Sequence, residues 1–156
     1  MTEPPLPLSL HVVTEDFSPR LREDALRALA GQMAAIIGAD QEEAILRSAQ
    51  EREELEPTYI GRGVAVPHAR VAGLPGASIL VAKSSRGIAW PEETAQLIVF
   101  LAVPEDRPDV YLQLLGGVMR WRHRLGLTQE QLLSMSPTDM EESLRRFLQL
   151  SIFPLP

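Results

Sequence analysis

The sequence predicts an α/β domain in which a β-sheet lies between two layers of helices. Apolar residues recur at helical spacing in the first and last thirds of the chain, whereas the middle third contains short runs of branched apolar residues bounded by glycine and proline. The chain has 156 residues, of which 45% are hydrophobic, and this suits one globular domain. Helices, strands and helices again within one domain imply a sheet that is covered on both faces.

The N-terminal segment is expected to be a tail followed by a short strand. Residues 1–9 contain three prolines and little periodic apolar content, so we expect a flexible tail there. A single domain would then span residues 10–152, beginning with an extended segment near Leu10–Val13.

Two helices are predicted next. Ser18-Pro19 is typical of an N-cap with proline at the first helical position, and helical spacing continues until Gly38, a plausible stop. A second helix is predicted from Asp40, where Glu43 would complete a capping box.

The remaining elements are three strands and three helices. The apolar runs predict strands over Val64–Val66, Ser78–Ser84 and Ala95–Val103. The predicted helices cover residues 108–124, a short segment capped by Thr128 with Gln131, and a last segment that starts at Ser136-Pro137 and ends near Leu150.

The composition excludes several kinds of site. The chain contains no cysteine, so a disulfide, a thiolate metal site and a cysteine nucleophile are excluded. The three histidines, His11, His68 and His123, form no local metal-binding pair, and we expect neither a metal nor a cofactor. A net charge of -6 argues against binding to nucleic acid or an anionic membrane. Without a recognisable signal peptide or membrane-spanning apolar run, we expect a cytoplasmic protein.

His68 is the histidine whose neighbours suggest chemistry. It lies in I-G-R-G-V-A-V-P-H-A-R, residues 60–70, after a short apolar strand and a stiff proline. Arg70 and Arg62 are close in sequence, and Arg52 lies one helix-to-strand connection upstream. A neutral imidazole among guanidiniums suits phosphoryl transfer, because the ring supplies the lone pair, while the arginines offset phosphoryl charge and lower the pKa of the imidazole. On spacing alone, however, a lone histidine in a loop is usually structural or merely solvated.

A longer pattern around His68 is similar to a known family. Residues 52–68, R-E-E-L-E-P-T-Y-I-G-R-G-V-A-V-P-H, closely resemble the active-site segment of the enzyme IIA components of the sugar phosphotransferase system. The type is that of fructose and mannitol, which includes the nitrogen-regulatory IIA proteins. Gly87-Ile88-Ala89-Trp90 and the run from Leu97 to Pro104 resemble, in order, the family's G-I-x-W step and its central strand.

The resemblance implies a fold, a function and two site residues. The fold would be a three-layer sandwich with a mixed β-sheet flanked by helices on both faces. The histidine of the V-P-H motif, here His68, would be phosphorylated by the phosphocarrier HPr and would pass the group to a cysteine on a IIB domain. The arginine of the R-E motif, here Arg52, would lie near the phosphohistidine.

Tyr111 departs from the family pattern. The family generally has a second histidine at the start of the helix after the central strand, and Tyr111 stands at that position. A phenol donates one hydrogen bond but remains neutral near pH 7. Either Arg70 or Arg107 compensates, or phosphoryl transfer is slow or lost. Tyr111 can also be a helix residue half packed against the core.

The sequence leaves three functions open. The first is a phosphohistidine carrier, whose apolar docking rim for partner proteins would draw on Val66, Ile88, Trp90 and Leu112; each can equally be core, and core is favoured for Trp90. The second is a regulatory protein-interaction module of the same fold with weak or no phosphotransfer, which the tyrosine favours. The third is a domain that keeps the fold but no phosphochemistry.

Overall fold

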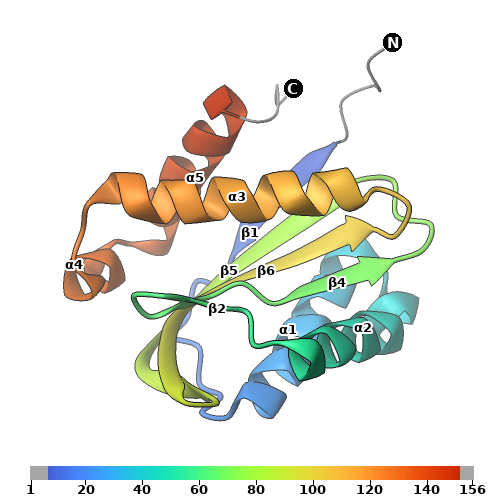
Figure 1. Cartoon of the computed structure of the whole chain (residues 1–156), viewed down its shortest axis with the longest axis horizontal. Helices are drawn as coiled ribbons and strands as arrows, with labels where there is room; N and C mark the ends of the chain where they lie inside the picture. Colours follow the sequence, from blue (N-terminus) through green and yellow to red (C-terminus); the bar gives the residue numbers. More distant parts are fainter. Residues whose placement is uncertain (1–6, 152–156) are drawn as a thin grey trace.

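The computed structural model describes residues 7–151 and consists of three layers (Figure 1). A six-stranded sheet forms the middle layer. On one side lie α1 (Arg22–Ile37) and α2 (Glu42–Leu55), joined by a 3-10 turn; on the other side lie α3 (Pro108–Leu125), α4 (Gln129–Ser134) and α5 (Pro137–Ser151). The prediction of an α/β three-layer sandwich is confirmed. Within the described residues, no helix combines the length and the apolar character that crossing a membrane requires.

The sheet is mixed, and its strands follow the order β1-β5-β6-β3-β2, with β4 also paired to β6. β5 and β6 form a long antiparallel hairpin, whereas β1 runs parallel to β5, and both β3 and β4 run parallel to β6. β3 and β4 therefore lie along successive stretches of the same side of β6. The strands are β1 (Leu8–Val12), β2 (Tyr59–Gly61), β3 (Val64–Ala65), β4 (His68–Val71), β5 (Ala77–Trp90) and β6 (Glu93–Pro104).

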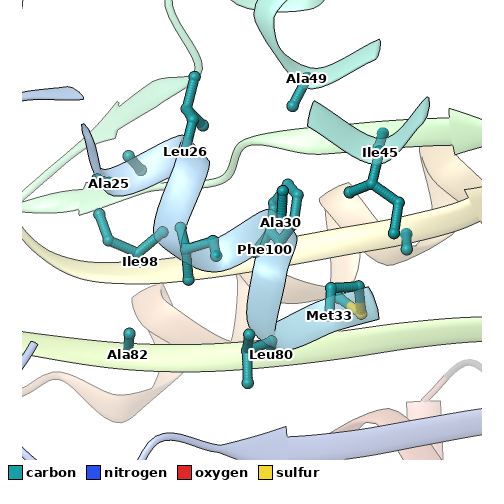
Figure 2. Close-up of a cluster of buried hydrophobic side chains, with 14 of the residues drawn as sticks. Ala25, Leu26, Ala30, Met33, Ile45, Ala49, Leu80, Ala82, Ile98 and Phe100 are labelled. Atoms are coloured by element: carbon teal, nitrogen blue, oxygen red, sulfur yellow. The ribbon is translucent and has the colours of Figure 1, made fainter. Parts of the chain in front are cut away.

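The sheet separates two hydrophobic cores, and β6 contributes to both. Ile98 and Phe100 pack with α1 and α2 in the core of Figure 2, whereas Leu97 and Val99 pack with the helices of the opposite face. Successive side chains of a strand point to opposite faces, so a strand that is covered on both faces must be apolar at nearly every position. This explains the continuous apolar run that the sequence shows there.

The predicted starts of the first two helices are wrong, and tertiary contacts explain the first. Ser18 caps no helix, because α1 begins at Arg22 after Leu21, which pairs with Ala89 beside the sheet. The sheet thus holds this segment extended. The capping box of Asp40 and Glu43 is absent as well, since the 3-10 turn Ala39–Gln41 precedes α2.

Other predicted boundaries agree more closely. α1 ends at Gly38, whose φ of 144° favours glycine, and Thr128 and Gln131 form the expected capping box of α4. β1 begins at Leu8, so residues 8 and 9 of the predicted tail belong to the sheet, while residues 1–6 and 152 lie outside the described part of the chain. The sequence did not predict β2 and β4, which are short.

Candidate functional site

His68 is the first residue of β4, and its backbone is fixed by the sheet. It pairs with Leu101 of β6, and the preceding Pro67 contributes a carbonyl that accepts a hydrogen bond from the Leu101 N–H at 3.0 Å. Ala69 and Val71 belong to the core on the side of α1 and α2. Because side chains alternate along a strand, the imidazole of His68 points to the face of α3.

The His68 ring is almost completely buried, with 4% of the residue exposed. Its Nδ1 lies 3.5 Å from the carbonyl oxygen of Val66. A carbonyl oxygen only accepts hydrogen bonds, so this contact favours the neutral tautomer that carries its proton on Nδ1. Nε2 then holds the lone pair.

Tyr111, in the first turn of α3, stacks on His68. The ring centroids are 4.0 Å apart and the planes are inclined by 29°. Tyr111 is also half-buried against the core under α3. The residue therefore packs against the core, as one interpretation expected, and also contacts the histidine; its role in the site stays a prediction. Among the described residues, no hydrogen bond joins the two rings.

Two arginines act electrostatically on His68. Burial is the largest cause that lowers the pKa of His68, to about 4, followed by the charge of Arg52 and then that of Arg70; the hydrogen bond to Val66 opposes the shift. The imidazole is therefore neutral at neutral pH. The sequence predicted the effect of the arginines, but the larger effect of burial required the structure.

Arg52 lies in the last turn of α2, where its Nη1 donates to the Glu56 carbonyl at 2.7 Å. Arg70 follows His68 by two residues on β4, and its side chain is exposed, while its backbone N–H donates to Ser48 Oγ of α2 at 2.9 Å. Both guanidiniums thus belong to segments that are held against each other. Arg107, the other residue considered as a substitute for the missing histidine, pairs with Asp109 at the start of α3.

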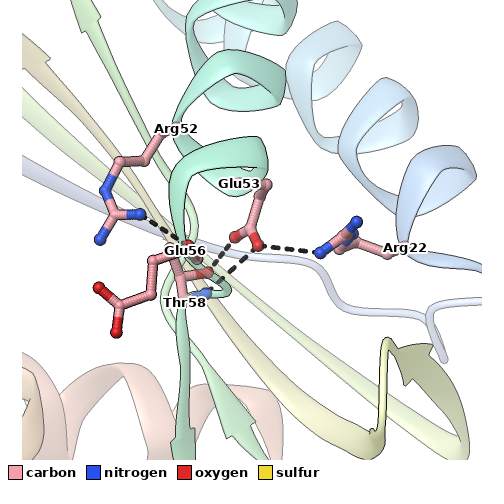
Figure 3. Close-up of polar contacts among 5 residues, drawn as sticks. All are labelled: Arg22, Arg52, Glu53, Glu56 and Thr58. Carbon is pink, nitrogen blue, oxygen red and sulfur yellow. Dashed lines mark hydrogen bonds and ion pairs between the residues drawn. The ribbon is translucent and has the colours of Figure 1, made fainter.

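Glu53 is a buried carboxylate that the sequence analysis did not single out. It accepts hydrogen bonds from the N–H of Thr58 at 3.2 Å and from the Thr58 hydroxyl, and it pairs with Arg22 at 3.4 Å (Figure 3). The Thr58 carbonyl in turn accepts from the Val66 N–H at 3.0 Å. Glu53 therefore fixes the connection between α2, which carries Arg52, and the segment that leads to His68.

A signal for Glu53 was present in the sequence. Ile45, Ala49 and Glu53 follow at intervals of four residues and all three are buried. A carboxylate that continues the apolar stripe of a helix must find hydrogen-bond donors in the interior. The register of α2 was therefore sufficient to mark Glu53 as a paired, buried acid.

Several residues predicted around the site lie elsewhere. Val66, Ile88 and Trp90 are fully buried in the two cores, which confirms the core interpretation favoured for Trp90 and excludes all three from a docking rim. Leu112, by contrast, is 64% exposed beside Tyr111. Arg62 is not among the charges that act on His68; it lines a separate pocket with Arg122. Within the described residues, no group of three His, Asp or Glu side chains is placed to hold a metal ion.

Comparison with known proteins identifies the family. Residues 9–138 match the family model described as "Phosphoenolpyruvate-dependent sugar phosphotransferase system, EIIA 2". The chain belongs to this family. The match includes the His68 strand, Arg52 and the first turn of α3, so the site lies inside the part that defines the EIIA 2 domain.

Two relatives show that proteins with different roles are similar to this EIIA 2 domain. The chain is 32% identical over 126 residues to the 2-O-alpha-mannosyl-D-glycerate-specific EIIABC component of Escherichia coli, which covers 72% of this chain but only 19% of that protein. It is 30% identical over 122 residues to a nitrogen regulatory protein of Bradyrhizobium diazoefficiens, covering 74% of this chain and 79% of that protein. Both sugar-specific and nitrogen-regulatory proteins are thus relatives of this EIIA 2 domain.

Solved structures confirm the fold. The mannitol IIA of Escherichia coli superposes with a TM-score of 0.65 at 19% identity, covering 86% of this chain and 94% of that one. The nitrogen regulatory IIA of Neisseria meningitidis gives 0.63 at 20% identity, with coverage of 86% and 92%. A complex of the Escherichia coli mannitol IIA with phosphorylated IIB matches at 0.59 and 18% identity, over 87% and 94%.

Proposed function

We propose that this EIIA 2 domain carries a phosphoryl group on His68. The observation that carries the proposal is the state of the His68 ring: buried, neutral at neutral pH, with Nδ1 on the Val66 carbonyl and the lone pair on Nε2. A nucleophile in this state needs no base to remove a proton before it reacts.

The reaction balances as a transfer between two histidines. The Nε2 lone pair of His68 attacks the phosphorus of a protonated phosphohistidine on an HPr-like carrier. The N–P bond of the donor breaks and leaves a neutral donor imidazole. The new N–P bond on His68 makes its ring cationic, and its Nδ1–H remains on the Val66 carbonyl. The donor thus loses the positive ring charge that His68 gains.

The two arginines are assigned to the phosphoryl oxygens. The charge that depresses the pKa of His68 in the free domain becomes attractive once three phosphoryl oxygens carry negative charge there. Arg52 is the stronger of the two influences, and its backbone contact with Glu56 holds its direction. Tyr111 supports the ring by stacking, and Arg70 supplies further charge at the exposed side.

The partners are proposed to be other proteins. The chain has no cysteine, so the acceptor thiol of a IIB domain lies outside these 156 residues. The exposed Leu112, one residue from Tyr111 on α3, would offer an apolar contact to the donor and the acceptor in turn. The EIIABC relative and the IIA–IIB complex support a IIB-type acceptor, and these reactions would take place in the cytoplasm.

The second candidate function is regulatory. Tyr111 occupies the position of the family's second histidine and covers one face of the His68 ring. A neutral phenol stabilises a phosphoryl group less than an imidazolium does, so the phosphorylated state would act as a signal to a target protein rather than as a rapid relay. The nitrogen regulatory relative supports this alternative.

Radiolabel transfer distinguishes the candidates. The domain is incubated with enzyme I, HPr and labelled phosphoenolpyruvate, and we expect acid-labile, base-stable label that is absent from His68→Ala and retained by His123→Ala, a matched exposed histidine. An unlabelled wild-type protein, or label that survives in His68→Ala, refutes the carrier. Label that forms but moves to no IIB domain favours the regulatory function.

A further inference from the structure

A second basic site lies at the far end of α3. A pocket of about 170 Å³ is lined by the β2–β3 turn and by the last turns of α3. Arg122, which lines it, follows Tyr111 by eleven residues, which is about 16 Å along a helix. The pocket residues are Ile60, Gly61, Arg62, Met119, Arg122 and His123.

Arg122 is a buried cation with an unused donor. Only 3% of the residue is exposed. Its Nη1 donates to the carbonyl of Leu127 at 3.0 Å, but its buried Nε has no acceptor among the described residues. A buried charge with an unsatisfied N–H is unfavourable unless a partner completes it.

Arg62 faces this cation from a turn that does not favour arginine. It has φ of +54° and the following Gly63 has φ of +79°, the conformation of a tight hairpin turn that asparagine and glycine adopt most readily. The Gly63 N–H donates to the Tyr59 hydroxyl at 2.8 Å, which holds the turn. The backbone would be less strained with asparagine at position 62. The turn therefore gives no reason for an arginine there, and we look for the reason in the charge of its side chain.

The pocket contains two arginines, and no carboxylate among the described residues balances their charge. Burial first, and then the charge of Arg62, lowers the pKa of Arg122, yet an arginine stays protonated at neutral pH. Within residues 7–151, no carboxylate pairs with either arginine. The C-terminal end of α3 offsets only about half an elementary charge. In a chain with net charge -6, two facing guanidiniums are an unusual concentration of positive charge.

We propose that this pocket binds a phosphate-sized oxyanion, either free phosphate or the phosphate group of a small phosphomonoester. An oxyanion placed there neutralises the repulsion between the two arginines and offers an acceptor to the Arg122 guanidinium, whose buried Nε–H lacks one, and exposed His123 contributes a further ring N–H at the rim. A volume of about 170 Å³ is below the range of about 300–1,000 Å³ that encloses drug-sized ligands, so the rest of a phosphomonoester would extend into solvent. This site does not depend on phosphorylation of His68.

The test follows the Nε–H resonance of Arg122 by ¹H–¹⁵N NMR on the unphosphorylated protein. Inorganic phosphate is titrated at constant ionic strength against chloride, and we expect a saturable shift of this resonance. Arg62→Asn keeps the turn and removes the charge, and we expect its affinity for phosphate to fall by at least about tenfold. Arg120→Gln, an exposed arginine on the same helix, is the matched control and should retain the affinity.

Further arms identify the ligand and separate this site from that of His68. Arg52→Ala should leave the Arg122 shift intact, because phosphate bound beside His68 is reported by other resonances. Tighter binding of glycerol phosphate than of phosphate assigns a phosphomonoester, and equal or weaker binding assigns the free ion; both support the site. No saturation, an equal response to chloride, a response to acetate alone, or an unchanged affinity in Arg62→Asn overturns it.

Discussion

His68 and Arg122 lie near opposite ends of α3, and each is buried close to another arginine. The same two influences lower the pKa of both, burial first and a neighbouring guanidinium second. They differ in the ordinary pKa of the side chain. His68 starts near 6.5 and becomes a neutral ring at neutral pH, whereas Arg122 starts so high that it stays charged.

Under the two proposals, one kind of environment would support two kinds of chemistry. A histidine that loses its proton gains a lone pair and can form a bond to phosphorus. An arginine that keeps its proton can only bind an anion. The surroundings differ accordingly: a paired carboxylate, Glu53, fixes the segments beside His68, whereas no carboxylate among the described residues pairs with Arg122 or Arg62.

The largest expected effect is the loss of stability when Glu53, which supports the segments beside His68, is removed. Glu53→Ala leaves the Thr58 N–H and hydroxyl and the Arg22 guanidinium without their shared acceptor, so the unfolding free energy should fall by about 3 kcal/mol. Urea denaturation measures it. The neighbouring Glu54→Ala, at an exposed position, should change stability little. Equal losses in the two variants would mean that the Glu53 network contributes nothing specific.

The pH dependence of stability tests the charge state of His68. Between pH 6.5 and about 4 the unfolded chain binds a proton that the folded chain does not, so the unfolding free energy falls as the pH is lowered through this window, by about 3 kcal/mol in all. The contribution is fully present above pH 6.5. His68→Gln should lack it, so denaturation of both proteins at pH 7 and pH 4.5 should show wild type losing more. Parallel losses would place the folded pKa near its ordinary value.

The role of Arg52 beside His68 can be tested through the rate of phosphorylation. Arg52→Ala should slow the labelling of His68 about 100-fold, the usual cost of removing one donor to a developing charge, and should also raise the pKa of His68. Initial rates with enzyme I, HPr and labelled phosphoenolpyruvate measure the effect. Arg47→Ala, on the exposed face of α2, is the control and should react normally. A normal rate in Arg52→Ala would remove Arg52 from the site.

Substitutions of Tyr111 test whether this residue takes part in phosphoryl transfer at His68. Tyr111→His introduces a histidine where the resemblance places the family's second one and adds a donor that can be charged, so labelling should speed up by about tenfold. Tyr111→Phe keeps the stacked ring and should label at the wild-type rate, since no hydrogen bond joins the hydroxyl to His68 within the described residues. An unchanged rate in Tyr111→His would argue against a role for position 111 in the transfer.

The smallest expected effect concerns the Arg122 side. Arg62→Asn relieves both the left-handed strain and the repulsion of Arg122, so in phosphate-free buffer the unfolding free energy should rise by about 0.5–1 kcal/mol. Adding phosphate should stabilise the wild type more than the variant and reduce this difference. Calorimetric melting in the two buffers measures both effects. A variant less stable than wild type without phosphate would show that Arg62 contributes to the fold itself.

The sequence predicted the parts of the molecule that local chemistry determines. Periodicity predicted the layered fold, and Thr128 with Gln131 predicted a cap that depends only on its own turn. Prediction from the sequence failed where tertiary contacts determine the local structure. Ser18 could not cap a helix because the sheet holds the following residues extended. Arg62 is six residues from His68 in sequence, yet the hairpin turn directs it to Arg122, and the pairing of Glu53 with Thr58 depends on a turn that periodicity does not describe.

The proposed carrier function requires that His68 is a neutral nucleophile and receives a phosphoryl group on Nε2. A long-range ¹H–¹⁵N spectrum of the histidine rings at pH 7, recorded before and after addition of enzyme I, HPr and phosphoenolpyruvate, tests it most directly. We expect a neutral His68 ring with its proton on Nδ1 before phosphorylation, and a phosphorus coupling at Nε2 of His68 afterwards. A cationic His68 ring at pH 7, or a phosphoryl group on Nδ1 or on another histidine, would contradict it.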